Sequence, residues 1–231
     1  MPPHACIFCG PSLSGLAPPQ HVDVYPPATR GALAQAANAG YKVIGFIDGA
    51  LEQADRVPLS ELRATLARPG VVLFGGASMG AVWAARLRTS GMRGVGRVFR
   101  LMHRRSLDDS DEVLLLHAPD TLRYRPLTIP LVNIRYTLRR MRRAGHIAPV
   151  EEKALVAYMR DVPWFDRDRH ALSAAAYTTC GVRSGRVLHA FDRLYRDVKQ
   201  EDAIAVCRAM QRHICRSQTG RPSEHLSRAA A

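Results

Sequence analysis

Gly76-Ala77-Ser78-Met79-Gly80 fits the pattern G-x-S-x-G, in which a serine on a sharp turn can act as a nucleophile. The motif follows the apolar run Val71–Phe74 and precedes an expected helix. Its small residues let the backbone turn and present the Ser78 hydroxyl, and the amides of Met79 and Gly80 are expected to face a developing oxyanion. The same residues could instead serve only close packing of strand and helix, with Ser78 as the helix N-cap.

Two further polar turns are expected beside this serine, because each follows an apolar run. Gly10 to Gly15 follows the run Ala5–Cys9, and Asp48 follows the run Tyr41–Ile47. The first turn lacks the lysine of a P-loop and the spacing of G-x-G-x-x-G, which disfavours the usual modes of nucleotide binding. Ser12 either donates a hydrogen bond to a ligand or caps the next turn, and Asp48 either belongs to the site or forms a local turn.

The cysteines do not indicate a metal site. Cys6 and Cys9 have C-x-x-C spacing but fall in one expected strand, where residues three apart face opposite sides. No second cysteine pair or nearby histidine completes a ligand set, so we expect neither a metal nor a cofactor. The odd number of cysteines, 5 in all, favours a reducing, cytoplasmic environment, and no apolar run reaches the length of about 18 residues that crosses a membrane.

The apolar runs predict an α/β fold. The runs 5–9, 41–47 and 71–74 are expected to be buried strands, and helices are expected between them at 30–39 and 59–67. Strands that alternate with short helices predict a parallel sheet built from Rossmann-like βαβ units. Residues 91–96 are expected to form a flexible loop and Val113–Leu116 a further strand.

From Pro126 onward the pattern is helical. The predicted helices are Leu131–Arg143, Glu151–Met159, Arg169–Tyr177, Val187–Arg196 and Lys199–Ile214. We therefore expect an α/β core over residues 1–125 and a helical lobe over 126–216 that packs on the core. A polar, alanine-rich tail over 217–231 is expected to be disordered.

The chain is strongly basic, with 33 Lys and Arg against 20 Asp and Glu and a formal charge of +13. Lysine contributes only Lys42, Lys153 and Lys199. Five arginines give one predicted helix a basic face that could bind phosphate, meet an acidic protein or simply be solvated: Arg135, Arg139, Arg140, Arg142 and Arg143. Aromatic residues make up 6% of the chain, which disfavours binding of single-stranded nucleic acid.

Several separate stretches of the sequence together resemble the TfuA family. The resemblance covers about residues 4–145 and extends thinly to about 207. The stretches are Gly10-Pro11-Ser12, Ile44-Gly45-Phe46-Ile47-Asp48-Gly49, Phe74-Gly75-Gly76-Ala77-Ser78-Met79-Gly80-Ala81, Gly91-Met92-Arg93-Gly94-Val95-Gly96, Asp111-Glu112-Val113, Val132-Asn133-Ile134-Arg135-Tyr136-Thr137 and Val198-Lys199-Gln200-Glu201-Asp202-Ala203.

The resemblance implies a partner of a YcaO enzyme in peptide-backbone thioamidation. A TfuA-like protein is expected to supply sulfide by hydrolysing the thiocarboxylate of a ThiS-type sulfur carrier with a Ser–Lys pair, while YcaO activates an amide of the precursor peptide or protein substrate. By motif, the pair falls on Ser78 and Lys199, which requires Lys199 to reach Ser78 from the start of its helix. Asn133 and Arg135 fall in another of the family's blocks and are expected to support the site, and Arg139, Arg140 and Arg143 are expected to bind a partner.

The sequence also departs from the family pattern. The basic residue that precedes the L-P-aromatic run is here Arg160, before Val162-Pro163-Trp164, and the usual Gly-Asp after the paired prolines is here Gly31-Ala32. If the working lysine belonged at position 160, the arginine would be a poor base because it stays protonated. A non-catalytic adaptor that binds YcaO and the carrier therefore remains an alternative, and a basic nucleic-acid-binding protein is a third.

Overall fold

The computed structural model of the chain describes residues 5–17, 19–105 and 110–218, and its centre is a five-stranded parallel sheet. The strand order is β2-β1-β3-β4-β5. The strands are β1 (Ala5–Phe8), β2 (Asp23–Tyr25), β3 (Val43–Phe46), β4 (Val72–Gly76) and β5 (Arg93–Val95). The predicted α/β class, with a parallel sheet and a helical C-terminal region, is confirmed.

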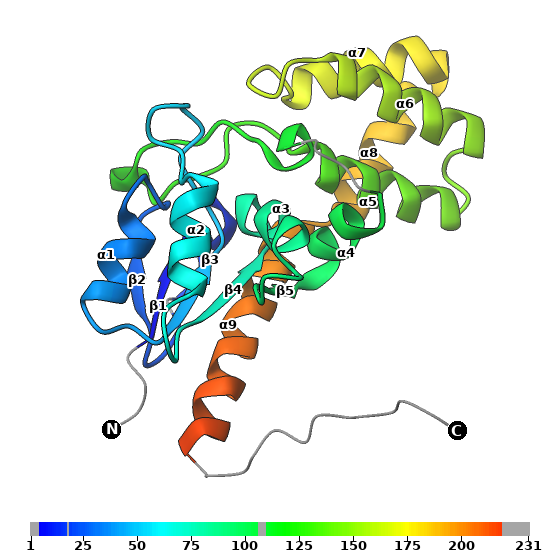
Figure 1. Cartoon of the computed structure of the whole chain (residues 1–231). Helices are drawn as coiled ribbons and strands as arrows, with labels where there is room; N and C mark the ends of the chain where they lie inside the picture. The colour runs from blue at the N-terminus through cyan, green and yellow to red at the C-terminus, as the bar shows by residue number, and fades with distance from the viewer. Residues whose placement is uncertain (1–4, 18, 106–109, 219–231) are drawn as a thin grey trace, which may run out of the picture.

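Helices surround the sheet and continue beyond it (Figure 1). Those that alternate with strands are α1 (Ala32–Asn38), α2 (Leu59–Leu66), α3 (Met79–Arg86) and α4 (Gly96–Arg105). Those that follow are α5 (Leu131–Arg143), α6 (Pro149–Asp161), α7 (Arg169–Cys180), α8 (Ser184–Leu194) and α9 (Val198–Gln218). The short 3₁₀ turns are η1 (Pro11–Leu13), η2 (Ser110–Val113), η3 (Asp120–Leu122) and η4 (Gly181–Arg183).

The two faces of the sheet are covered by different helices, because alternate side chains of a strand point to opposite faces. Cys6 and Phe8 of β1 pack in one core with residues of α1, α2 and α3. Ala5 and Ile7 pack in a second core with the apolar side of α9. Helix α9 alone supplies Ala203, Val206, Cys207, Met210 and Ile214 to that second core. The sheet is thus buried on both faces, as parallel sheets generally are.

Helices α5 to α8 have a separate core of their own, centred on residues such as Leu138, Leu155 and Leu172. Figure 1 shows these helices gathered to one side of the sheet, and α9 running from them back along the sheet. Helix α9 therefore packs with the α/β layer, although it lies inside the segment 126–216 that the sequence assigns to the lobe. Residues 219–231 of the predicted disordered tail lie outside the described residues.

Three sequence predictions of local structure differ from what the structure shows. Strand β2 was not predicted because its three residues are exposed at the sheet edge and carry no apolar run. The predicted loop 91–96 contains strand β5, which pairs with β4. The predicted strand Val113–Leu116 is wrong: Val113 ends turn η2, and the amide and carbonyl of Leu116 bond to Thr128 Oγ1 and to the amides of Leu127 and Thr128.

In the part of the chain that the structure describes, no helix is both long enough and apolar enough to cross a bilayer.

Gly80 is the position where the sheet and α3 approach most closely. A methyl group at Gly80 would lie 1.7 Å from the carbonyl oxygen of Phe46, and backbone cannot move aside cheaply. We expect Gly80→Ala to destabilise the fold by about 3 kcal/mol or more, measured by urea denaturation. The control is Gly185→Ala in α8, where a methyl group meets no atom within 4 Å and stability should be unchanged or slightly raised. Equal stability of the two variants would contradict this account of the junction.

Candidate functional site

Three predicted site residues follow neighbouring strands at the carboxyl edge of the sheet. Ser12 lies in the turn after β1, Asp48 follows β3, and Ser78 follows β4. Strands β1 and β3 are adjacent, yet their following connections lead to opposite sides of the strand order. Such a reversal point is where open parallel sheets of this order bind ligands.

Asp48 and Ser12 are bound to one another. The Asp48 carboxylate accepts hydrogen bonds from the amides of Gly10 at 2.9 Å and Ser12 at 3.0 Å, and from the Ser12 hydroxyl at 2.7 Å. Both side chains are buried. This contact joins the turns after β1 and β3, so Asp48 holds the edge of the sheet together and the Ser12 hydroxyl is already engaged.

Ser78 differs from Ser12, because no hydrogen bond joins its hydroxyl to the described residues. The residue stands at the N-cap position of α3, but its side chain makes no capping hydrogen bond. The preceding Ala77 has a φ of +62°, a conformation that costs a non-glycine residue about 1 kcal/mol. The strained turn holds Ser78 with 6% of its surface exposed. The side-chain contact expected of a helix cap is thus missing at Ser78.

The two amides predicted to face an oxyanion are not equivalent. The Gly80 amide donates to the carbonyl oxygen of Ile47 at 3.0 Å. That bond fastens α3 to the end of β3, so the Gly80 amide is not free in this structure. The amide of Met79 has no hydrogen-bond acceptor within the described ranges. Of the two, Met79 is the amide that can still donate to a ligand.

Lys199 is the second residue of α9 and is 2% exposed. Its ammonium group donates to the carbonyl oxygen of Val113 at 2.7 Å. Burial lowers the pKa of Lys199, while the charges of Asp48 and Asp197 raise it by a smaller amount. No hydrogen bond connects Lys199 with Ser78 in the described parts of the chain. We call Ser12, Asp48 and Ser78, which follow β1, β3 and β4, the strand-end cluster. Lys199 is therefore a buried amine with a lowered pKa, held beside this cluster, where the charge of Asp48 acts on it.

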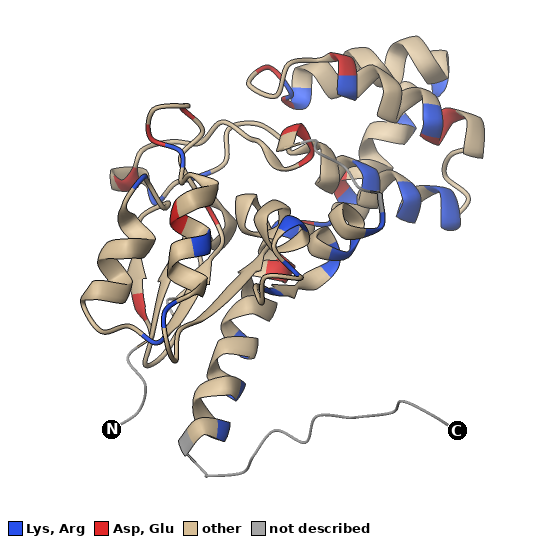
Figure 2. Cartoon of the chain, viewed as in Figure 1, with Lys and Arg blue, Asp and Glu red and all other residues tan. Residues whose placement is uncertain are grey.

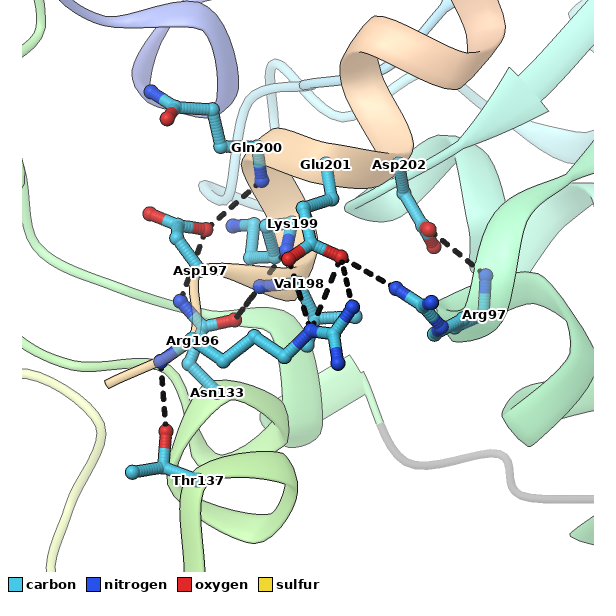
Figure 3. A network of polar contacts seen from close by, with 10 residues as sticks. All are labelled: Arg97, Asn133, Thr137, Arg196, Asp197, Val198, Lys199, Gln200, Glu201 and Asp202. Atoms are coloured by element: carbon cyan, nitrogen blue, oxygen red, sulfur yellow. Dashed lines mark hydrogen bonds and ion pairs between the residues drawn. The ribbon is translucent and has the colours of Figure 1, made fainter. Parts of the chain in front are cut away.

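Asn133 of α5 fixes the start of α9 (Figure 3). Its carbonyl oxygen accepts from the amides of Val198 at 3.0 Å and Lys199 at 3.3 Å, and its amide group donates to Asp197 Oδ1 at 3.1 Å. Asp197 Oδ1 also caps α9 by accepting from the amide of Gln200 at 2.8 Å. Asn133 thus sets the position of the backbone that carries Lys199.

The next turn of α9 holds the start of α4, again through a side chain that accepts hydrogen bonds from backbone amides. The Asp202 carboxylate accepts from the amides of Arg97 at 2.9 Å and Val98 at 2.7 Å, which satisfies two free donors at the start of α4. Gly96, with a φ of +98°, leaves room for that carboxylate. Glu201 pairs with Arg97 and Arg196 (Figure 3). Asp202 and Glu201 were not predicted as site residues, and their role here is to position α4 against α9.

Arg135 supports the site through turn η2. Its guanidinium binds both carboxylate oxygens of Glu112, at 2.8 and 2.9 Å, and Glu112 is almost fully buried. The next residue, Val113, supplies the carbonyl oxygen that Lys199 binds. Arg135 therefore acts on Lys199 indirectly, by holding the segment that accepts its hydrogen bond.

The other arginines of α5 differ in whether they form an ion pair. Arg142 forms an ion pair with Glu152, whereas Arg139 lies over the ring of Tyr136 at 5.6 Å. Among the described residues no ion pair involves Arg139, Arg140 or Arg143, and Arg140 and Arg143 are exposed. These three arginines present uncompensated positive charge on α5, in a region where basic residues recur along the helix (Figure 2).

Arg160 lies on the exposed side of α6, within the helical lobe. The buried cation at the strand-end cluster is Lys199, not Arg160. The sequence could have revealed Asp197 as well, because an Asp followed three residues later by Gln is a signature of a capped helix start. No local signal in the sequence indicates that the Val113 carbonyl binds Lys199.

Residues 5–17, 19–105 and 110–218 contain no group of three or more His, Cys, Asp and Glu side chains arranged to hold a metal ion. Cys6 and Cys9 lie in different cores on opposite faces of the sheet.

A family model described as TfuA-like protein matches residues 48–168. The matched segment contains Asp48, Ser78, Asn133 and Arg135, whereas Ser12 and Lys199 lie outside it. A search of curated proteins found no match to the chain. The family match spans just over half of the 231 residues and includes the G-A-S-M-G turn at the sheet edge, so the chain belongs to the TfuA-like protein family.

Proposed function

We propose that this protein hydrolyses the carboxy-terminal thiocarboxylate of a ThiS-type sulfur carrier and so supplies sulfide to a YcaO enzyme that thioamidates a peptide or protein backbone. In this proposal Ser78 is the nucleophile and Lys199 the base. The observation that carries it is the burial of Lys199 beside the strand-end cluster, which lowers the pKa of the only buried lysine of the three. Membership of the TfuA-like family supports a role together with YcaO.

The first half of the reaction transfers the acyl group. Neutral Lys199 takes the proton of the Ser78 hydroxyl, and Oγ attacks the carbonyl carbon of the thiocarboxylate. The Met79 amide donates to the oxygen that gains negative charge. The C–S bond then breaks, and sulfur leaves as hydrosulfide with the proton that Lys199 received. Hydrosulfide is a good leaving group, so this step needs less protonation than expulsion of an amine.

The second half regenerates the protein. Water attacks the Ser78 ester and Lys199 takes a proton from that water. The C–O bond to Ser78 then breaks as Lys199 returns this proton to Ser78 Oγ. The products are the free Ser78 hydroxyl and the carboxylic acid of the carrier, which releases its proton to solvent and becomes the carboxylate. Lys199 donates to Val113, and no hydrogen bond joins it to Ser78 among the described residues, so proton transfer between them requires one bridging water or a shift of the lysine side chain when the carrier binds.

The adaptor alternative rests on a different observation, the uncompensated arginines of α5. An adaptor would bind the carrier or YcaO through this face without hydrolysing the thiocarboxylate. The measurement that separates the two readings is sulfide release from thiocarboxylated carrier when this protein is the only other component.

Ser78→Ala should keep the fold and lower hydrolysis by about 10³-fold or more, because it removes the nucleophile from a turn whose backbone bonds remain. Sulfide release in a single turnover measures the effect. Ser12→Ala is the matched control, since Ser12 Oγ contributes one buried hydrogen bond to Asp48 and its loss should cost about 1 kcal/mol of stability without abolishing hydrolysis. Loss of hydrolysis in Ser12→Ala alone would move the nucleophile to the first turn.

The rate of hydrolysis should rise with pH as Lys199 loses its proton, with a midpoint below the ordinary lysine value of 10.5 because burial lowers its pKa. Asp48→Asn removes a negative charge that favours the ammonium form, so the midpoint should move to lower pH.

Lys199→Arg and Lys199→Met should both lose hydrolysis, and the methionine variant should remain folded because it replaces a buried cation by an apolar chain of similar length. An unchanged pH midpoint in Asp48→Asn, or an active Lys199→Met variant, would remove Lys199 from the role of base.

The double variant Arg140→Glu, Arg143→Glu should weaken binding to an acidic protein partner and reduce the salt dependence of the affinity, because exposed interface charges act mainly through long-range attraction. The matched control is Arg208→Glu with Arg212→Glu on the exposed side of α9, which changes the charge equally. Titrations of carrier and YcaO partner at several salt concentrations measure both effects. An equal loss in the two double variants would mean that net charge alone matters, and steeper salt dependence for duplex DNA than for the carrier would favour nucleic-acid binding.

A further inference from the structure

A small hollow on the helical lobe has basic side chains at four of its six lining positions. Its volume is about 380 Å³, and its lining consists of His146, Gly185, Arg186, His189, Ala190 and Arg193. We propose that this hollow binds phosphate groups of a small ligand. The proposal does not depend on thiocarboxylate hydrolysis, because none of these residues belongs to the strand-end cluster.

Helix α8 presents most of the hollow from one side. Arg186, His189 and Arg193 are separated by three and four residues, so they project from one face of the helix. Between them Gly185 and Ala190 leave space, because their side chains are absent or small. His146 comes from the connection between α5 and α6 and closes the hollow from another element. Basic side chains from two parts of the chain therefore line the hollow.

The positive charge of the hollow is not neutralised within the described chain. No carboxylate lines it, and Asp192, the nearest acid in sequence on α8, pairs with Arg169 of α7 at 2.6 Å. Arg186 forms no ion pair with a described residue. Arg193 contacts His146 Nε2 at 3.1 Å, and because a guanidinium only donates, the histidine nitrogen is the acceptor. That bond aims Arg193 at the hollow and leaves its remaining N–H groups for a ligand.

The shape of the hollow favours phosphate over other anions. Two arginine forks and the His189 imidazole can donate from several directions to a tetrahedral oxyanion, and arginine matches phosphate oxygens in pairs. A volume of about 380 Å³ accommodates a small ligand, whereas an acidic helix or strand needs an extended surface. The lining holds no aromatic residue other than the imidazoles, which disfavours recognition of a stacked nucleobase. The recognised group is therefore the phosphate, most strongly when two phosphates are linked.

The test is isothermal titration of the full chain with pyrophosphate, inorganic phosphate and ATP, together with an acidic peptide of glutamates. We expect one pyrophosphate per chain, bound more tightly than phosphate. Arg186→Gln and Arg193→Gln should each weaken it at least about tenfold, since each removes a charge-assisted contact. Arg186→Lys keeps the charge without the fork and should lose an intermediate amount. ATP bound more tightly than pyrophosphate would identify a nucleotide as the source of the phosphates, and ATP bound more weakly would identify free pyrophosphate.

The controls are Arg208→Gln and Arg212→Gln, made singly on the exposed side of α9; each removes one positive charge, as each test variant does, and should leave pyrophosphate binding unchanged. Circular dichroism of each variant checks that the exposed substitutions preserve the fold. Absence of pyrophosphate binding, equal weakening by the control variants, or tighter binding of the glutamate peptide than of pyrophosphate would each overturn the proposal.

Discussion

The hydrogen bonds of Asn133 to the start of α9 are the contacts on which the arrangement of this protein depends. A helix start leaves backbone amides without partners, and burying such a start requires acceptors for them. Asn133 and Asp197 supply those acceptors, one from α5 and one from the helix's own cap. The same carboxamide therefore connects the helical lobe to the helix that covers one face of the sheet. Without it, α9 could not begin inside the protein, and Lys199 could not be buried at the edge of the sheet.

Turn η2 shows how charge is distributed around this junction. Three of its four residues each bind a basic side chain from a different part of the chain: Asp111 binds Arg167, Glu112 binds Arg135, and the Val113 carbonyl binds Lys199. Both arginines pair with a charged carboxylate, whereas Lys199 pairs only with the dipole of a neutral carbonyl group. The carboxylates of Asp48 and Asp197 act on Lys199 without a hydrogen bond to it. Because no carboxylate pairs directly with Lys199, the effect of burial on its pKa exceeds that of the nearby negative charges, and the pKa falls.

The sequence predicted those features that depend on local periodicity. Helix α5 was predicted with its observed bounds because its apolar residues recur at helical spacing, and the buried strands β1, β3 and β4 were found from their apolar runs. Strand β5 was missed because residues 93–95 carry glycine and arginine and pair only at the edge. The hydrogen bond of the Gly80 amide to Ile47 was not predicted, because Ile47 becomes a neighbour only when β3 and α3 pack. The same holds for Val113 and Lys199, which are distant in sequence and meet through tertiary structure alone. Packing partners of this kind leave no trace in a periodic pattern.

Arginine and lysine occupy different places in this protein, because only lysine can lose its proton when it is buried. Arginine cannot lose its proton in a protein, and it is the residue used in ion pairs such as Arg135–Glu112 and on the exposed faces of α5, α8 and α9. Lysine can become neutral when it is desolvated, and Lys42 and Lys153 are exposed whereas Lys199 is buried. If the junction needed only a cation, an arginine paired to a carboxylate would hold it more firmly, as Arg135 does with Glu112. A lysine opposite a neutral carbonyl stabilises the fold less and responds to pH more. The proposed role of Lys199 in proton transfer rests on this difference, because Lys199 is buried and Asp48 and Asp197 act on it without a hydrogen bond.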